Sequence, residues 1–308
     1  MALSILPFES PGSRSTKKKA QAHIVNIDTH TQFCGVIGNP VEHSLSPAIH
    51  NAAFQRLELN FVYLAWRVET IGDAIRGLRA LGNFRGASVT IPHKVGAMPF
   101  LDHIEPVAGH IGAVNTIVAD KGALAGYNTD ATGALRALRE GGAPLKNESV
   151  VVLGSGGAAR AIAFALAGQA GVSRIHLLGI EEQERVVLAR ELRDKTAADV
   201  SDAVLEDAVL RRVLPEARVL IHCTPVGMTP KIGSSCVPSG LLHRDLTVMD
   251  IVYNPRNTQL LKDAAASGCR TIAGLEMFLY QAAAQFELWT GRPAPIDVMR
   301  GVLESHFS

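Results

Sequence analysis

A glycine-rich turn stands between a β-branched run and an alanine-rich segment at residues 150–161, V-V-V-L-G-S-G-G-A-A-R-A. This order predicts a strand, a tight turn and a helix start, the pattern of a dinucleotide-binding unit. Gly154 would form the turn, Gly156 would leave room for a pyrophosphate, and Ala159 would let the helix pack close to the strand. Free backbone N–H groups at the helix start favour an anion. A plain tight turn remains the structural alternative.

Polar residues with possible acid–base or binding roles follow other predicted strands. Residues 89–94, V-T-I-P-H-K, end a strand at a proline, which puts Lys94 at the strand end. Solvent exposure is the simpler explanation for that lysine, and packing is the simpler one for His93. Asp130 begins a predicted helix, so it could serve as the N-cap alone. Asn115 could likewise be only a turn former.

Two serines stand one residue apart in a strand-to-helix turn. Ser46 precedes Pro47, which predicts a helix start capped by the Ser46 hydroxyl. Ser44 has no such structural explanation, and the pair could hold a polyol or a carboxylate. Gln281 is polar within an otherwise apolar helix predicted for residues 275–289, so it either satisfies a buried group or faces a ligand.

From residue 150 onward, strands alternate with helices, which predicts an α/β fold with a parallel sheet covered by helices. The loop at residues 223–228 follows a predicted strand, at the sheet edge where such folds bind ligands, although an ordinary loop is the alternative. Residues 141–144 would link into the nucleotide unit. The predicted strands cover residues 33–37, 61–68, 87–91, 117–119, 150–153, 174–178, 219–222 and 247–252. The predicted helices start at 46 and 130 and cover 69–81, 157–168, 181–193, 257–267, 275–289 and 296–303.

Composition indicates an enzyme-sized soluble protein. A chain of 308 residues fits two domains, and a net charge of +1 gives no electrostatic case for nucleic acid or an anionic membrane surface. No apolar run approaches the roughly 18 residues of a membrane span. The cysteines are scattered without ligand-like spacing, which argues against a metal site or a disulfide framework and suits the cytoplasm. They are Cys34, Cys223, Cys236 and Cys269.

Residues 1–30 are expected to form a disordered tail. The segment contains prolines, serines and the run Lys17-Lys18-Lys19, and its short apolar patch lacks a cleavage-type pattern. A secretory signal is therefore not expected. A plastid-type transit peptide stays open, because the segment is basic, contains serine and is poor in acids.

Eight motifs together resemble the shikimate dehydrogenase family, and they occur in the family's order. Eight collinear motifs are far more specific than any one of them, and the resemblance covers residues 33–303. The motifs are G-N-P-V-E-H-S-L-S-P (38–47), V-T-I-P-H-K (89–94), G-A-V-N-T (112–116), G-Y-N-T-D (126–130), G-S-G-G-A-A-R-A (154–161), T-P-V-G-M (224–228), D-I-V-Y-N-P (250–255) and G-L-E-M-F-L-Y-Q-A-A (274–283).

The resemblance implies an α/β fold with an amino-terminal substrate domain, a Rossmann-like dinucleotide-binding domain and a cleft between them. The substrate domain would span residues 31–132, with residues 275–308 returning to it, and the dinucleotide-binding domain would span 133–274. The implied activity moves hydride between a nicotinamide cofactor, NAD or NADP, and a ring carbon of shikimate. A lysine beside the reacting hydroxyl could accept its proton and return it in the reverse direction.

The resemblance also assigns roles to individual positions, with no metal among them. Lys94 and Asp130 match the catalytic pair, and Ser44 and Ser46 match the pair that holds the substrate carboxylate. The other substrate contacts implied are Thr90, Asn115 and Gln281 at ring hydroxyls, with Tyr253 at the cleft. The cofactor contacts implied are Gly154, Ser155, Gly156, Gly157 and Ala158 for the pyrophosphate, and Thr224, Pro225, Val226, Met228, Ile251 and Gly274 on the nicotinamide side.

Two departures from the family pattern matter. Ser88 stands where many members have asparagine, which puts one substrate contact in doubt. Ile180 stands where NADP-using members have the arginine that binds the 2′-phosphate. Beside it, Glu181 and Glu182 would repel a phosphate, and Glu181 could bind ribose hydroxyls, although both could be first-turn helix charges only. NAD is therefore favoured, with Arg185 as a possible phosphate partner.

Several alternatives remain open at this stage. Quinate or an aminated shikimate analogue could replace shikimate as the substrate. A non-catalytic sensor could keep the fold and bind shikimate without turnover. A two-domain enzyme acting on a folate or another carbonyl substrate is a third possibility, which the polyol-binding pattern disfavours. The protein is expected to act as a monomer or a homodimer on a small molecule, without nucleic acid or membrane.

Overall fold

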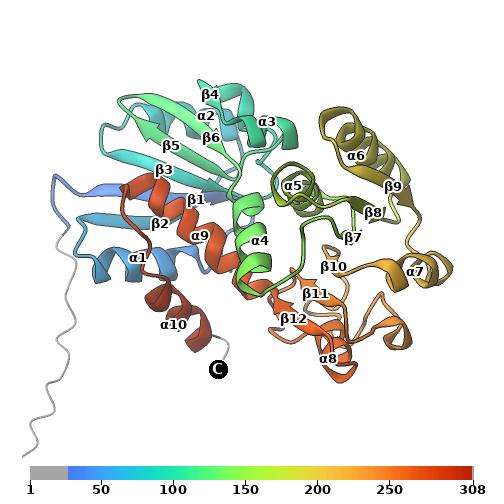
Figure 1. Cartoon of the computed structure of the whole chain (residues 1–308). Coiled ribbons are helices and arrows are strands. Elements are labelled where there is room, and N and C mark those ends of the chain that lie inside the picture. The colour runs from blue at the N-terminus through green and yellow to red at the C-terminus, as the bar shows by residue number, and fades with distance from the viewer. Residues whose placement is uncertain (1–26, 307–308) are drawn as a thin grey trace, which may run out of the picture.

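The computed structural model describes residues 27–306 and contains two six-stranded sheets, seen side by side in Figure 1. The expected tail therefore lies almost wholly outside the described residues. The first sheet has the order β2-β1-β3-β5-β6-β4. Its strands are β1 (Gln32–Gly38), β2 (Phe61–Arg67), β3 (Phe84–Val89), β4 (His103–Ile104), β5 (Thr116–Asp120) and β6 (Ala123–Tyr127).

The first sheet is mixed, with both parallel and antiparallel pairs. β1 pairs in parallel with β2 and β3, but β5 runs antiparallel to both β3 and β6. Successive residues of β1 point to opposite faces, so Val36 packs in one core and Ile37 in another. Helices α1 (Ser46–Arg56), α9 (Gly274–Thr290) and α10 (Ile296–His306) cover the first face. Helix α2 (Ile71–Arg79) and the short α3 (Pro106–Ile111) cover the second.

The second sheet is entirely parallel and has the order β12-β11-β10-β7-β8-β9. The chain runs outward from β7 through β8 and β9, then returns to the other side of β7 with β10. This reversal creates a topological switch point, and α/β sheets bind ligands at the strand ends beside it. The strands are β7 (Ser149–Leu153), β8 (Arg174–Leu178), β9 (Asp199–Ala203), β10 (Val219–His222), β11 (Thr247–Asp250) and β12 (Arg270–Ala273).

Helices cover both faces of the second sheet, as the alternation predicted. Helices α4, α5 and α6 pack in one core cluster, and α7 and α8 pack in the other. A π-helical turn follows α5, where a continuous helix to residue 168 was expected. No helix within residues 27–306 is long and apolar enough to cross a membrane. The bounds are α4 (Thr129–Glu140), α5 (Gly157–Ala165), α6 (Glu182–Lys195), α7 (Asp207–Val213) and α8 (Gln259–Ala266).

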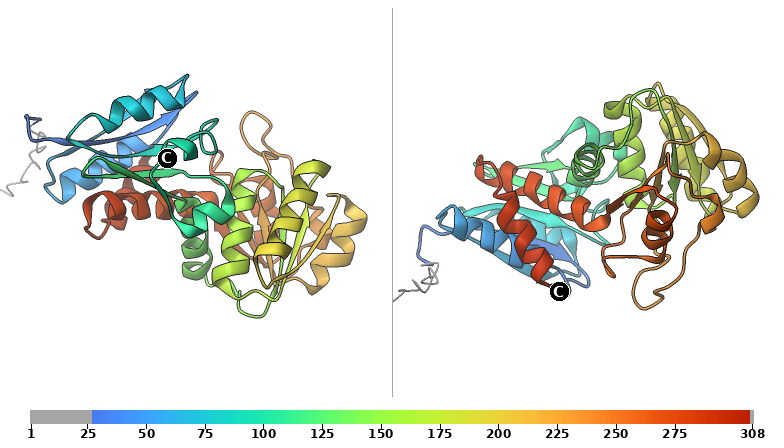
Figure 2. Two further views of the ribbon diagram at one scale, coloured as in Figure 1. Left: turned by 90° about the horizontal axis from the view of Figure 1, so that it is seen from above. Right: turned by 60° about the horizontal axis from the view of Figure 1, so that its bottom comes forward.

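Helices α4 and α9 connect the two sheets, which form two lobes in Figure 2. The two helices approach closely at Gly133. A Cβ atom at this position would lie 2.6 Å from the backbone nitrogen of Gln281 and 2.8 Å from the carbonyl oxygen of Met277. Only glycine permits this spacing, which brings the middle of α9 against the first half of α4.

Candidate active site

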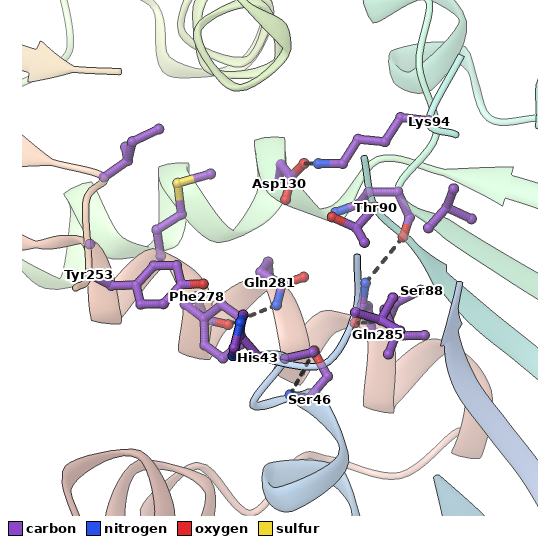
Figure 3. Close-up of a pocket in the computed structure, with 18 of the residues that line it drawn as sticks. His43, Ser46, Ser88, Thr90, Lys94, Asp130, Tyr253, Phe278, Gln281 and Gln285 are labelled. Carbon is purple, nitrogen blue, oxygen red and sulfur yellow. Dashed lines mark hydrogen bonds and ion pairs between the residues drawn. The ribbon is translucent and has the colours of Figure 1, made fainter. Parts of the chain in front are cut away.

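A cavity of about 350 Å³ lies between the two sheets, and side chains from both halves of the chain line it (Figure 3). All eight residues expected to act in catalysis or substrate binding are among the lining residues. Two of the expected nicotinamide-side residues, Ile251 and Gly274, line it as well. The lining residues are Val36, Pro40, Val41, His43, Ser44, Ser46, Ser88, Val89, Thr90, Lys94, Asn115, Asp130, Ile251, Tyr253, Gly274, Met277, Phe278, Gln281 and Gln285.

Lys94 and Asp130 form an ion pair inside this cavity. Lys94 Nζ lies 2.6 Å from Asp130 Oδ2, and the two side chains are 29% and 14% exposed. The alternative that Asp130 only caps α4 is wrong, because the N-cap is Asn128, whose side chain accepts the N–H of Ala131. His93, next to the lysine, donates from Nε2 to the Val68 carbonyl at 2.7 Å, which fits a packing role. The carboxylate is therefore available to orient the lysine.

The side chain of Asn115 has one fixed orientation. Its Oδ1 accepts the backbone N–H of Thr129 at 2.7 Å and the hydroxyls of Thr116 at 2.8 Å and Thr129 at 3.1 Å. A backbone N–H can only donate, so the atom that faces it must be the amide oxygen. The Nδ2 donor consequently points away from these partners and is available to a ligand hydroxyl in the cavity.

A buried chain of hydrogen bonds stabilises the position of this asparagine. The Tyr63 hydroxyl lies 2.6 Å from Ser88 Oγ, which donates to Gln285 Oε1 at 2.8 Å. Gln285 Nε2 in turn donates to Thr116 Oγ1 at 3.0 Å. Burial raises the pKa of Tyr63, so the phenol stays neutral. Sequence reasoning missed Gln285, although it follows Gln281 by one helical turn, which is the spacing of neighbours on one helix face.

The two serines exchange the roles expected from the sequence. Ser46 is the first residue of α1, and no side chain caps the helix at Leu45. Ser44 Oγ instead accepts the Ser46 N–H at 3.3 Å. The expectation that Ser46 caps the helix is therefore wrong. Its hydroxyl is left for other partners, and both serines line the cavity. His43, which the sequence reasoning did not single out, lines it beside them.

The glycine-rich turn after β7 leaves an open cradle of backbone N–H groups. Gly154 has φ +106°, a conformation that side chains rarely adopt, and forms the expected turn. Gly156 is the N-cap of α5, with no side-chain cap hydrogen bond. A Cβ atom at Gly156 or Gly157 would meet no atom within 4 Å. Uncapped N–H groups beside open space at a nine-residue helix fit a pyrophosphate group.

The cofactor residues expected from the sequence all follow the carboxyl ends of parallel strands. The glycine turn follows β7, the loop 224–228 follows β10, Ile251 follows β11 and Gly274 follows β12. Gly154 also lies beside the second of these segments, because a Cβ atom at its position would be 3.4 Å from Thr224 Cγ2. This common edge agrees with a dinucleotide lying across the switch point.

Carboxylates dominate the end of β8, where a 2′-phosphate would bind. Ile180 is 73% exposed, and Glu181 is the N-cap of α6, with Glu182 and Glu184 in its first turn. Arg185 is not available to a phosphate, contrary to the earlier possibility. It is buried and donates to the Gly179 carbonyl at 2.9 Å, with its Nε 3.3 Å from an Asp202 carboxylate oxygen.

Comparisons with known proteins identify relatives that cover most of this chain. The family model described as "Shikimate dehydrogenase substrate binding domain" matches residues 36–117, and "Shikimate 5'-dehydrogenase C-terminal domain" matches residues 274–304. Shikimate dehydrogenase (NADP(+)) of Desulforamulus reducens is 44% identical over 282 residues, which cover 90% of this chain and 96% of that protein.

Solved structures are similar over the same extent. Shikimate 5-dehydrogenase from Listeria monocytogenes, in complex with shikimate and NAD, has a TM-score of 0.87 and 38% identity, covering 90% of this chain and 98% of its own. Quinate dehydrogenase from Corynebacterium glutamicum, in complex with NAD, has a TM-score of 0.83 and 31% identity, covering 89% and 99%.

Proposed function

This chain belongs to the shikimate dehydrogenase family, and from that premise we propose that it interconverts shikimate and 3-dehydroshikimate by hydride transfer with a nicotinamide cofactor. The observation that carries this proposal is the 2.6 Å contact between Lys94 and Asp130 in a cavity lined by hydroxyl and amide groups. A ring with several hydroxyls and a carboxylate matches such a lining, because each polar group of the ligand finds a partner.

Oxidation of a secondary alcohol removes a hydride from carbon and a proton from oxygen. The nicotinamide ring, when bound, supplies the hydride acceptor. Lys94, in its neutral form, takes the hydroxyl proton and returns it in the reverse reaction. Asp130 hydrogen-bonds the same or the adjacent hydroxyl and holds Lys94 in place, which the ion pair supports.

The remaining polar side chains would hold the substrate in one orientation. Ser44 and Ser46 would donate to the carboxylate, which suits hydroxyls at the start of α1. Burial raises the pKa of Tyr253, so its phenol remains a donor at neutral pH. Ring hydroxyls would be bound by Thr90, Asn115 and Gln281, all of which line the cavity.

We infer NAD as the preferred cofactor, although curated relatives carry NADP(+) in their names. What supports this preference is the end of β8, where an exposed isoleucine and three nearby glutamates replace a phosphate partner. Glu181 would accept hydrogen bonds from ribose hydroxyls. The pyrophosphate would lie on residues 154–158, and the nicotinamide side would contact Thr224, Pro225, Val226, Met228, Ile251 and Gly274.

We propose that residues 31–132 and 275–308 form the substrate-binding domain, and that residues 133–274 form the cofactor-binding domain. What supports it is the packing of α9 and α10 in the same core cluster as α1 and β1. The second sheet, in contrast, is built entirely from residues 149–273. Closure of the two halves on one another would bring the cofactor edge against the substrate cavity.

Initial rates of nicotinamide reduction test the function, with shikimate and quinate each paired with NAD and NADP. We expect turnover to be fastest with shikimate and NAD. Faster turnover with NADP would mean that the glutamates after β8 are surface helix charges only. Faster turnover with quinate would show that quinate, rather than shikimate, is the preferred substrate. A folded protein that binds shikimate but turns over in no pairing would make it a non-catalytic sensor.

A further inference from the structure

His222, the last residue of β10, has both ring nitrogens engaged by side chains. Its Nδ1 lies 2.8 Å from Asp250 Oδ1, and its Nε2 lies 2.5 Å from Thr224 Oγ1. The histidine is 1% exposed and the aspartate is fully buried. Asp250 also accepts the N–H of Val252 at 3.0 Å and the hydroxyl of Thr258 at 2.6 Å. The pair therefore connects the ends of β10 and β11 beneath the proposed nicotinamide side.

The environment favours the imidazolium form of this histidine. Burial by itself lowers the pKa of His222, but the hydrogen bond to Asp250 and the charge of its carboxylate, together with the nearby Cys236, outweigh it and raise the pKa to about 9. Two titratable groups act on the ring: Asp250 from β11 and Cys236 from the segment between β10 and β11. Cys223, the next residue in the chain, interacts with Asp250 instead. Burial, followed by the charge of Asp250, raises the pKa of Cys223, which keeps that thiol neutral.

An imidazolium at this position determines what the Thr224 hydroxyl can do. A doubly protonated ring donates from both nitrogens, so Thr224 Oγ1 accepts from His222, and it also accepts the Val226 N–H at 3.3 Å. Two accepted bonds occupy both lone pairs of the oxygen. The hydroxyl proton must then be donated elsewhere, and no acceptor for it is found among residues 27–306.

Thr224 lies where such a donor would meet the cofactor. It follows β10 at the switch point, and its Cγ2 lies 3.4 Å from the Cβ position of Gly154 in the glycine-rich turn. The side chain is partly exposed rather than sealed in the core. Its proton therefore has access to a ligand that lies across the turn and the loop 224–228.

We propose that the His222–Asp250 pair is a positioning device that keeps the Thr224 hydroxyl available as a hydrogen-bond donor to the bound dinucleotide. This inference rests on the proposed function. When His222 loses its proton, Nδ1 keeps its hydrogen for Asp250, and Nε2 becomes an acceptor. Thr224 then donates to the ring instead, and the dinucleotide loses one hydrogen bond.

Fluorescence titration of the full chain with NADH at pH 7.5 and pH 10 tests this inference without turnover. We expect the Kd of the wild type to rise roughly fivefold between the two pH values, the effect of one ordinary hydrogen bond. Thr224→Val should bind roughly fivefold more weakly at pH 7.5 and show no further weakening at pH 10. Thr224→Ser, which restores the hydroxyl, should recover both the affinity and its pH dependence.

Two further variants serve as controls. Thr229→Val removes a hydroxyl that donates to Asn254 in the loop after β11, and it should bind as the wild type does. Cys236→Ser should keep a pH dependence but shift it to lower pH, because Cys236 contributes to the raised pKa of His222. Wild-type affinity or wild-type pH dependence in Thr224→Val overturns the inference. Shikimate turnover by the wild type is measured separately, so failure of the proposed function is distinguishable from failure of this inference.

Discussion

Lys94 and Asp130 meet although 36 residues separate them in the chain. We predict that Lys94→Ala lowers kcat by roughly 10²- to 10⁴-fold, because the reaction loses its proton acceptor. The KM for shikimate should change little, since the hydroxyl and amide contacts remain. Steady-state kinetics with both substrates varied measures the two effects. Lys262→Ala, which removes an exposed lysine on α8, is the control, and a Lys94→Ala turnover near wild type would show that the assignment is wrong.

Gln285 supports the substrate side of the cavity rather than the chemistry. Gln285→Leu removes the amide that links Ser88 to Thr116, and leaves Asn115 without support from behind. We predict a rise of roughly tenfold in the KM for shikimate and a smaller effect on kcat, since a misplaced donor weakens binding by about the energy of one hydrogen bond. Gln259→Leu, on the surface of α8, is the matched control. An unchanged KM would contradict this role.

Among the elements, α4 and α9 set the position of several site residues at once. α4 carries Asp130 in its first turn, and α9 carries Gln281 on the face that meets Gly133. The first half of α4 and the middle of α9 therefore cannot move apart without moving both residues. Because the side chain of Asn128 caps α4, the carboxylate of Asp130 does not cap the helix and can pair with Lys94.

The contact at Gly133 is testable by adding a single methyl group. Gly133→Ala would place Cβ 2.6 Å from a backbone nitrogen of α9, so the helices must separate. We predict a loss of roughly 1–3 kcal/mol in the free energy of unfolding and a higher KM for shikimate. Denaturant unfolding and kinetics measure the two effects. Gly301→Ala in α10 meets no atom within 4 Å and should instead stabilise by up to about 1 kcal/mol. Equal stability of the two variants would refute the close approach.

At the scale of the whole molecule, a buried histidine links folding to pH. His50 is fully buried, and its ring stacks on Tyr63 with centroids 4.5 Å apart. Burial lowers the pKa of His50 from 6.5 to about 3. Below pH 6.5 the imidazole of His50 is therefore protonated in the unfolded chain but not in the folded protein. The free energy of unfolding falls as the pH falls from 6.5 towards 3.

We predict that His50→Phe weakens this acid sensitivity. In the wild type, the free energy of unfolding should fall by an extra ~1.4 kcal/mol for each pH unit below 6.5, as one additional proton is bound on unfolding. The variant should lack that contribution between pH 6.5 and pH 5. Denaturant titrations at several pH values measure the slopes, with His110→Phe, at an exposed position, as the control. Identical slopes for wild type and His50→Phe would contradict the prediction.

Sequence reasoning recovered most of the elements and the parallel second sheet, but not the mixed pairing of the first sheet. Strands β8 and β10 begin and end where they were predicted, because short buried apolar runs bounded by turns are local signals. The edge strand β9 was missed, since its sequence D-V-S-D-A alternates polar residues and buries little. Mixed pairing in the first sheet also escaped prediction, because strand direction depends on partners distant in the chain.

The sequence by itself determined the glycine turn, the α/β alternation and the family, since each depends on residue types close together or on motifs in order. Only the tertiary structure decided that Lys94 meets Asp130, that Gln285 supports Asn115 from 170 residues away, and that Arg185 is committed to Asp202. It alone joined His222 to Asp250. The physical reason is the same in each case: a side chain's role depends on the charge, the donors and the burial around it, and folding assembles these from segments that the chain order keeps apart.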